Sequence, residues 1–201
     1  MPKQPPRIIL LDSCAYFRLA YPLHPLLACP FGPPPPFALR VLDEVDDEYF
    51  SACSRLKNKF EWMGHKGFKQ DREANRYQCK GKVVEAVDNA MSFLLEYVKQ
   101  NRFELPSEPS REDLRVLAVG YSRGFPVVSD DTAILDIALV FEIECWTSLD
   151  LLKRMHEHNH IAKEKIRQIV DYWHYSNDLP CSREKIIVWY HSVFNEELKF
   201  E

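Results

Sequence analysis

Long apolar runs are missing from this chain of 201 residues, and their absence limits the compartments and partners that we expect. The apolar run nearest the N-terminus covers residues 8–11 and leads into an acid, so it is too short for the core of a signal peptide. No stretch approaches the roughly 18–20 apolar residues that a membrane-spanning helix needs. We therefore expect a cytoplasmic protein without a membrane partner.

Closely spaced cysteine pairs, glycine-rich phosphate loops and an excess of positive charge are missing as well. The six cysteines form no C-x-x-C pair, which argues against a tetrahedral zinc cage and favours reduced, partly buried thiols. No G-x-G-x-x-G or G-x-x-x-x-G-K-[ST] motif occurs, so dinucleotide binding and P-loop chemistry lack support. The formal net charge is −4, so a surface that attracts nucleic acid has to be local.

The hydrophobic pattern that is present alternates between short strands and longer helices. Apolar, β-branched runs predict strands at residues 8–11, 37–42, 125–129 and 142–148. Helical periodicity and capping signals predict helices at residues 13–21, 83–102, 113–124, 132–141, 149–173 and 181–194. This alternation predicts an α/β fold with a central parallel sheet and helices on both faces.

Residues 1–150 are expected to form the main domain, with residues 151–201 as a C-terminal helical extension packed on it. Within the main domain, the proline-rich residues 22–36 predict a rigid connector. Residues 51–82 form a basic insertion with interleaved aromatic residues. This insertion either grips single-stranded nucleic acid through phosphate contacts and stacking, or is a solvated segment whose aromatic side chains pack inward. Under the first interpretation, the candidate RNA-binding residues are Arg55, Lys57, Lys59, Lys66, Lys69, Arg72 and Arg76.

Acidic residues recur where the expected strands end. Asp12 follows the first strand, and Asp130 and Asp131 follow the third. Glu44 and Glu48 lie one helical turn apart just after the second strand, so both can face the same way. Because parallel sheets bind ligands outside the carboxyl ends of their strands, these acids are candidates for a single cleft.

Asp113 opens the helix before the third strand and extends this set of acids. Several carboxylates in one low-dielectric site repel one another unless a proton or a cation relieves them. Oxygen ligands without nearby His or Cys favour Mg²⁺ or Mn²⁺ over zinc, and such a site suits the attack of water on a phosphodiester. Each acid alone also has a structural interpretation: Asp12 as a helix cap, Asp113 as part of a capping box with Ser110, and Asp130 or Asp131 as turn residues.

Three stretches of the sequence resemble the PIN domain family, the nuclease fold of many VapC-like toxins. "IILLDSCAYFRLA" resembles the opening strand of the family with its first acid, which falls on Asp12. "VLDEVDDEYF" resembles the segment with a helix-borne glutamate, which falls on Glu48, with Glu44 as the alternative. "SREDLRVLAVGYSRGFPVVSDDTAIL" is the best of the three matches and places the third acid on Asp113 and the fourth on Asp131.

This resemblance implies that the four acids hold one or two Mg²⁺ or Mn²⁺ ions, with Asp130 as a further metal ligand. Ser129 and Glu44 would support the site. The implied fold is a PIN-like three-layer α/β/α sandwich, to which this chain adds a helical insertion and C-terminal helices. The implied partners are an RNA substrate, a small antitoxin protein and a second copy of the chain.

The expected function is therefore a metal-dependent endoribonuclease, in the role of the toxin of a type II toxin–antitoxin pair. Two alternatives stay open: a PIN-shaped RNA-binding or scaffold module without catalysis, and a structure-specific DNA nuclease. Outside the acids, His156 and His160 are spaced to share a helix face, with His158 between them. Without the acid of an H-E-x-x-H motif, a solvated polar face is favoured there over a zinc site. Cys14 is expected to be a small packed thiol and not a nucleophile.

Overall fold

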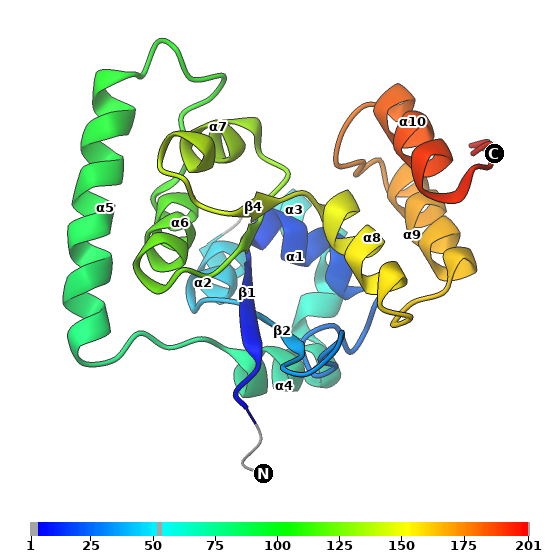
Figure 1. The fold of residues 1–201 in the computed structure, drawn as a ribbon, viewed down its shortest axis with the longest axis horizontal. Helices are drawn as coiled ribbons and strands as arrows, with labels where there is room; N and C mark the ends of the chain where they lie inside the picture. Colours follow the sequence, from blue (N-terminus) through cyan, green and yellow to red (C-terminus); the bar gives the residue numbers. More distant parts are fainter. Residues whose placement is uncertain (1–3, 52–53, 201) are drawn as a thin grey trace.

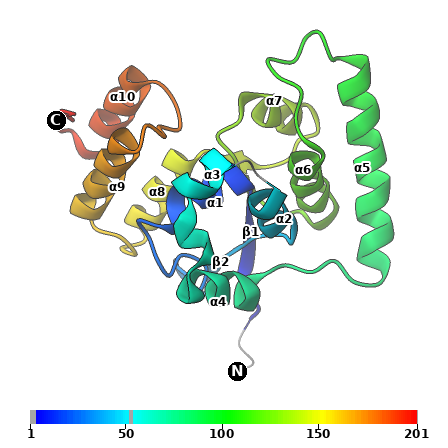
Figure 2. The same ribbon diagram turned by 180° about the vertical axis from the view of Figure 1, so that it is seen from behind.

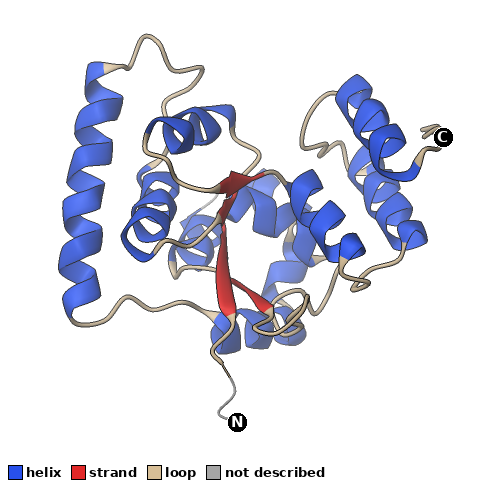
Figure 3. Ribbon diagram, viewed as in Figure 1, coloured by secondary structure: helices blue, strands red, loops and turns tan. Residues whose placement is uncertain are grey.

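The sheet at the centre of the molecule has four parallel strands (Figures 1 and 3). The computed structural model describes residues 4–51 and 54–200, and side chains within these ranges outside residues 50–56. The strands are β1 (Arg7–Leu11), β2 (Phe37–Arg40), β3 (Val127–Val128) and β4 (Cys145–Trp146), in the order β2-β1-β3-β4. β1 pairs with β2 and β3, and β3 pairs with β4, so the α/β class with a central parallel sheet is confirmed.

Helices surround this short sheet on both faces (Figures 1 and 2). The long helix α5 and the pair α9–α10 lie at opposite ends of the molecule in both views. The helices are α1 (Ser13–Ala20), α2 (Glu44–Ser51), α3 (Ser54–Lys59), the 3₁₀ helix η1 (Glu61–Gly64), α4 (Lys66–Asn75), α5 (Lys82–Gln100), α6 (Arg111–Arg123), α7 (Thr132–Val140), α8 (Ser148–Glu157), α9 (Lys163–Tyr175) and α10 (Arg183–Phe194).

The two faces of the sheet have separate apolar cores, because side chains alternate along a strand. Ile9 and Leu11 belong to a core shared with α1, α8, α9 and α10, in which Trp173 is fully buried. Leu10 belongs to a second core, shared with α5, α6 and α7. The indole nitrogen of Trp173 donates to the backbone oxygen of Arg18 at 2.9 Å, which ties α9 to α1. β1 is therefore buried on both sides, and its carboxyl end is fixed in position.

The segment that precedes β3 follows the sequence signals closely. Ser110 caps α6 and forms a capping box with Asp113, and Gly124 ends the helix in the left-handed conformation with φ 62°. Gly120 lets α6 approach β3, because an added Cβ would lie 2.6 Å from the Val127 side chain. These local signals fix where β3 begins and therefore where the residues after it lie.

The expected single helix over residues 149–173 is wrong. It divides into α8 and α9, because Asn159 adopts a left-handed conformation with φ 54° after the end of α8. The backbone N–H groups of Asn159 and His160 turn back to His156 and Met155. Asparagine tolerates this conformation better than most residues, but the apolar periodicity hides the break.

The basic insertion packs its aromatic residues inward, as the second interpretation of residues 51–82 holds. Phe60 and Trp62 are buried, and Phe68 packs against the same core. Arg72 is also buried, with 1% of its surface exposed, and its guanidinium binds Asp46 at 2.8 Å and the Met63 carbonyl at 2.9 Å. Arg72 is a structural residue, so its predicted contact with RNA is wrong.

The described cysteines do not form disulfides with one another. Free thiols are found at Cys14, Cys29, Cys79, Cys145 and Cys181, and Cys53 lies outside the described residues.

The described helices are also not suited to a membrane. Across residues 4–51 and 54–200, no helix combines the length and the apolar character needed to cross one.

Candidate active site

Asp12 lies where β1 passes into α1, at the carboxyl edge of the sheet. Its backbone N–H donates to the Val128 carbonyl at 3.0 Å, and its Oδ1 accepts from the Ala15 N–H at 2.6 Å, which caps α1. Only 2% of the residue is exposed. Its other oxygen, Oδ2, is buried and has no hydrogen bond of normal geometry to any described residue. Asp12 thus offers one buried oxygen for a proton or a cation.

The electrostatic surroundings of Asp12 favour its protonated form. Burial raises the pKa of this carboxyl to about 7, with smaller contributions from the charges of Asp130 and Asp113 and against the opposing hydrogen bonds of the Ser129 hydroxyl and the Ala15 N–H. A buried carboxylate is costly unless something compensates its charge. A divalent cation would supply that compensation at neutral pH.

Glu48 and Asp113 approach the site from α2 and α6. Burial raises the pKa of Glu48, which the Ser13 hydroxyl counteracts and the neighbouring charge of Asp113 reinforces. Burial likewise raises the pKa of Asp113, and the charge of Asp131 adds to the effect. Because each carboxylate affects the next, the four acids predicted from the sequence form one electrostatic cluster. Ser13 was not predicted, although its position directly after Asp12 signals a role at the same edge.

Asp131 and Ser129 come from the turn between β3 and α7. Asp131 Oδ1 accepts from the N–H groups of Ala133 at 2.8 Å and Ile134 at 3.1 Å, so it caps α7. The Asp131 N–H donates to Ser129 Oγ at 3.1 Å, and Ser129 is fully buried. The Ser129 hydroxyl therefore contacts both the Asp12 side chain and the Asp131 backbone, and its support of a metal site stays a prediction.

The carboxylate of Asp130 is occupied by other protein groups and not by the acidic cluster. Its carboxylate binds Arg18 on α1 in a buried ion pair and accepts from the Ser148 N–H at 2.8 Å and the Ser148 hydroxyl at 2.6 Å. Arg18 also donates to the Asp178 carbonyl at 3.0 Å. Both oxygens of Asp130 are engaged in joining α1 to α8, and Arg18 in turn joins α1 to the segment after α9. We therefore correct its expected role from metal ligand to structural residue.

Glu44 and several basic candidates are also engaged in ion pairs. Glu44 pairs with Arg115 on α6, so it braces α2 against α6 and its expected support of the metal site is indirect at most. Arg76 pairs with Asp46 at 2.6 Å, and Lys59 pairs with Asp178 at 3.2 Å.

Other candidate RNA contacts remain at the surface of the insertion. Lys66 and Lys69 are exposed, and Lys57 is half-buried. The side chain of Arg55 lies outside the described residues. The predicted RNA surface is therefore reduced to a few lysines on α3 and α4.

The fit of a metal ion can be tested on the donor set itself. The buried Oδ2 of Asp12 and the coupled carboxylates around it supply the oxygen donors that Mg²⁺ and Mn²⁺ prefer. Within the described part of the chain, no three His, Cys, Asp or Glu side chains are arranged to hold a metal ion as they stand. The donors fit a hard divalent ion in kind, although the described side chains as they stand do not form a complete set of ligands.

Cys14 lies beside the acids and reaches solvent, in contrast to the expected packed thiol. The sulfur itself is surrounded mainly by protein atoms, and this burial raises the pKa of the Cys14 thiol to about 12. The negative charges of Asp12, Asp113 and Glu48 add to the effect. The thiol is neutral at physiological pH, so a nucleophilic role for Cys14 is disfavoured.

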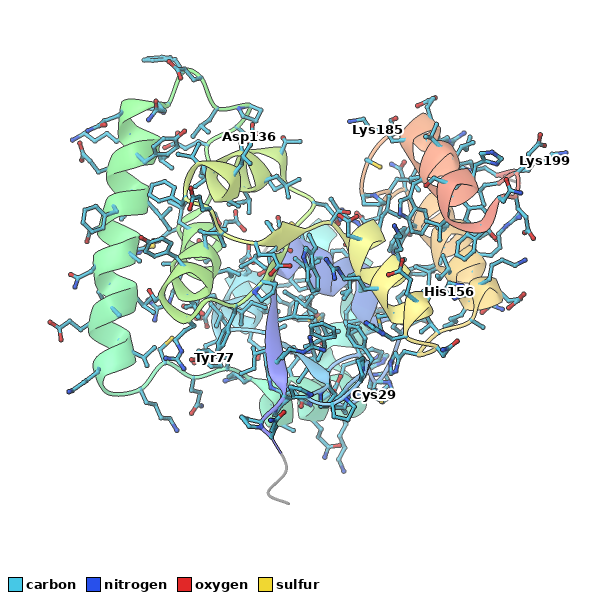
Figure 4. All side chains as sticks on the ribbon, in the orientation of Figure 1. Cys29, Tyr77, Asp136, His156, Lys185 and Lys199 are labelled. Atoms are coloured by element: carbon cyan, nitrogen blue, oxygen red, sulfur yellow. The ribbon has the colours of Figure 1, made fainter. Side chains whose placement is uncertain are left out.

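The three histidines do not form a metal site. His156 lies on α8 (Figure 4), and its Nδ1 is 3.0 Å from the Ile161 carbonyl. His160 lies beyond the end of that helix, with its ring 5.6 Å from the ring of Phe31. The break between α8 and α9 removes the shared helix face that the spacing of the two histidines suggested.

Fold and site together define an α/β protein with an acidic cluster at the carboxyl edge of a parallel sheet. No family model and no curated protein matches the sequence. Among solved structures, the chain is similar to a chain in the crystal structure of FitAcB from Neisseria gonorrhoeae. The two are 13% identical, the match covers 70% of this chain and 97% of the other, and the TM-score is 0.44. At this level of similarity, the argument for a function rests on the side chains of the site.

Proposed function

We propose that this protein is a Mg²⁺- or Mn²⁺-dependent endoribonuclease that hydrolyses phosphodiester bonds, with Asp12, Glu48, Asp113 and Asp131 as its metal ligands. The observation that carries the proposal is the buried Oδ2 of Asp12, which has no hydrogen bond of normal geometry to any described residue and belongs to a cluster of coupled acids. Burial of this acid for structure alone would leave that oxygen uncompensated.

A divalent ion at these acids would lower the pKa of a bound water and stabilise the negative charge that develops on the phosphate. The protein groups orient the ligands. The Ser13 hydroxyl stabilises Glu48, and Ser129 stabilises Asp12 while it accepts the Asp131 N–H. The capping box holds the Asp113 carboxylate 2.7 Å from the Ser110 hydroxyl. These contacts are the kind that fix the direction of a metal ligand.

Within this proposal, the exposed lysines Lys66 and Lys69 and the half-buried Lys57 guide the RNA strand through phosphate contacts. The role as a toxin and the antitoxin partner also belong to the proposal. A small protein that covers the acidic cluster would block access of RNA to it.

A non-catalytic RNA-binding or scaffold module is the alternative, and one observation favours it. Asp12, Asp113 and Asp131 each cap the start of a helix, so each has a structural reason to be an acid. The two candidate functions differ in whether the protein binds Mn²⁺ and cuts RNA.

The test compares wild-type protein with Asp12→Asn and Asp131→Asn. Each variant is incubated with labelled single-stranded RNA, with Mn²⁺ or with EDTA, and Mn²⁺ binding is measured by calorimetry. Asparagine also caps helices well, so both variants should fold. The matched control is Asp136→Asn, an exposed acid on the same helix that Asp131 caps (Figure 4).

The proposal expects Mn²⁺-dependent cleavage in wild type and Asp136→Asn, and a loss of about a hundredfold or more in the other two variants. Binding of RNA without cleavage in every condition would support the module. Preferential cutting of flapped or nicked DNA duplexes would support the third interpretation, a structure-specific DNA nuclease.

A further inference from the structure

A pocket lies at the opposite edge of the sheet, where the strands begin. Its lining includes Arg7 at the start of β1, Phe37 at the start of β2, Phe125 just before β3 and Trp146 on β4. Its volume is about 450 Å³. Pockets of a few hundred Å³ accommodate small organic ligands. The candidate active site follows the other ends of the same strands, so the two sites are distinct.

Three arginines line this pocket, and each guanidinium lies over an aromatic ring. Arg7 is 3.8 Å from the centre of the Phe37 ring, and Arg154 on α8 is 4.0 Å from the centre of the Trp146 ring. Arg123, the last residue of α6, is 5.5 Å from the centre of the Phe125 ring. All three distances fall within the range of cation–π contacts.

The charge of the pocket is positive in a chain whose net charge is −4. Glu144 is the acid among the described lining residues, and it lies 4.0 Å from Arg154. Its Oε1 also accepts from the Trp146 indole nitrogen at 2.9 Å. One carboxylate that faces three guanidinium groups leaves charge for an anionic ligand to neutralise.

The arrangement selects among anions. A guanidinium held flat on a ring can direct its in-plane N–H donors to phosphate oxygens, and its outer face can stack on a planar group. In Arg7, Nε already donates to the Pro35 carbonyl at 2.9 Å, which leaves the terminal NH₂ groups for a ligand. Arg123 comes from the end of α6 and Arg154 from α8, and these two helices pack on different faces of the sheet. Both arginines line the same cavity. A ligand with a phosphate and a flat aromatic ring matches both features.

We propose that the pocket at the amino edge of the sheet, with Arg7, Arg123 and Arg154 on aromatic rings, binds a nucleotide through its phosphate and its base. This site is independent of the nuclease proposal, because none of the four candidate metal ligands lines it.

The test is a binding titration of the full chain at low ionic strength with EDTA present, so that the acidic cluster binds no metal-bridged ligand. The probes are AMP and UMP, with adenosine and inorganic phosphate as partial ligands. The variants are Arg123→Gln and Arg154→Gln. The matched control is Arg183→Gln. Arg183 lies on α10, which does not line the pocket, and its guanidinium also lies over an aromatic ring, that of Phe200.

We expect at least one nucleotide to bind wild-type protein and Arg183→Gln equally, and each pocket variant to bind about tenfold more weakly. Adenosine and phosphate should each bind more weakly than the nucleotide. Glu144→Gln should bind the nucleotide more tightly, because it removes the competing charge and keeps an acceptor for the Trp146 indole. Thermal unfolding of each variant checks that it is folded.

Three results would overturn the proposal. These are no nucleotide binding by folded wild-type protein, equal affinity in the pocket variants and the control, or phosphate binding as tight as nucleotide binding. The indole N–H resonance of Trp146, assigned with Trp146→Phe, gives a second measurement. It should shift on nucleotide addition in wild type, and an unchanged resonance at saturation would also contradict the site.

Discussion

At the carboxyl edge of the sheet, acids are buried and tied to backbone N–H groups, whereas at the amino edge arginines lie on aromatic rings and reach solvent. Asp12 is 2% exposed and caps α1, while Arg154 keeps 41% of its side chain exposed over Trp146. In the first arrangement, ionisation of the buried acids lowers the free energy of unfolding, and a bound cation would offset that cost. In the second, the arginines stay largely solvated while they contact the rings, so their charges remain accessible to an anionic ligand.

The comparison also separates two kinds of acid at the carboxyl edge itself. Asp130 is fully compensated by Arg18 and Ser148, whereas Oδ2 of Asp12 has no hydrogen bond of normal geometry to a described residue. These two acids are far apart in the sequence but lie at the same edge of the sheet: Asp130 holds helices together, and Asp12 is the acid that we propose for chemistry. The predictions below test this division, beginning with the largest effect.

Replacing Arg18 should cause the largest loss of stability. Arg18→Ala leaves the carboxylate of Asp130 buried, with 5% of its side chain exposed, and bound only by the Ser148 groups that the structure describes. Breaking a buried ion pair by removing one partner costs about 3–5 kcal/mol. Urea unfolding measures this change, with Arg102→Ala as a control that breaks an exposed pair with Glu108. A loss below about 1 kcal/mol in Arg18→Ala would contradict the structural role of Asp130.

Asp12 should make the metal-free protein less stable as the pH rises. The folded-state pKa of Asp12 is about 7 against an ordinary value of 3.8, so the folded protein holds a proton that the unfolded chain releases. The contribution is favourable below pH 4 and is lost between about pH 4 and pH 7, by up to about 4 kcal/mol.

Unfolding free energies across this pH range, measured with EDTA, test the effect. Asp12→Asn should show a flatter pH profile than wild type and Asp136→Asn, and it should be more stable than wild type at pH 8. Parallel profiles for wild type and Asp12→Asn would show that burial of Asp12 carries no such cost.

The two capping boxes offer a matched comparison of smaller size. Ser110 with Asp113 starts α6 at the site, and Thr147 with Asp150 starts α8 away from it. Ser110→Ala and Thr147→Ala should each lose about 1 kcal/mol of stability, because each removes a helix cap. Only Ser110→Ala should also weaken Mn²⁺ binding, since Asp113 loses the hydroxyl that orients it. Equal Mn²⁺ affinity in both variants would remove Asp113 from the ligand set.

The smallest effect is expected at the exposed lysines of α4. Lys66→Gln with Lys69→Gln removes two positive charges from the surface without touching a buried group. Affinity for single-stranded RNA should fall a few-fold at low salt and change little at high salt, because these contacts are screened. The same fall at both salt concentrations would argue against phosphate contacts there.

Local signals in the sequence predicted the backbone around the candidate site best. The Ser110–Asp113 box, Gly124 and the apolar pair before Ser129 determine α6, β3 and the turn after it, so Asp113 and Asp131 lie at the starts of α6 and α7 as expected, while their role as metal ligands stays a prediction. Predictions that depended on tertiary contacts were wrong. Arg72 and Asp130 look like free charges in the sequence, and their partners Asp46 and Arg18 lie 26 and 112 residues away.

Other features could not be read from periodicity. The apolar pattern continues across the break between α8 and α9, and the left-handed Asn159 is a backbone property that periodicity does not report. The arginine pocket joins residues from β1, α6 and α8, none of which forms a motif with the others. Sites of this kind come from the assembly of elements and require the structure.

The central claim is that the acids at the carboxyl edge form a cation site built around Asp12, and a Mn²⁺ titration of wild type and Asp12→Asn at pH 6 and pH 8 tests it most directly. Calorimetry in two buffers of different ionisation enthalpy also counts the protons released. Binding by wild type should be tighter at pH 8 and should release about one proton at pH 6, because Mn²⁺ displaces the proton of Asp12. Asp12→Asn should bind at least tenfold more weakly and release none. Mn²⁺ binding of equal strength in both proteins, or no binding by wild type at either pH, would contradict the claim.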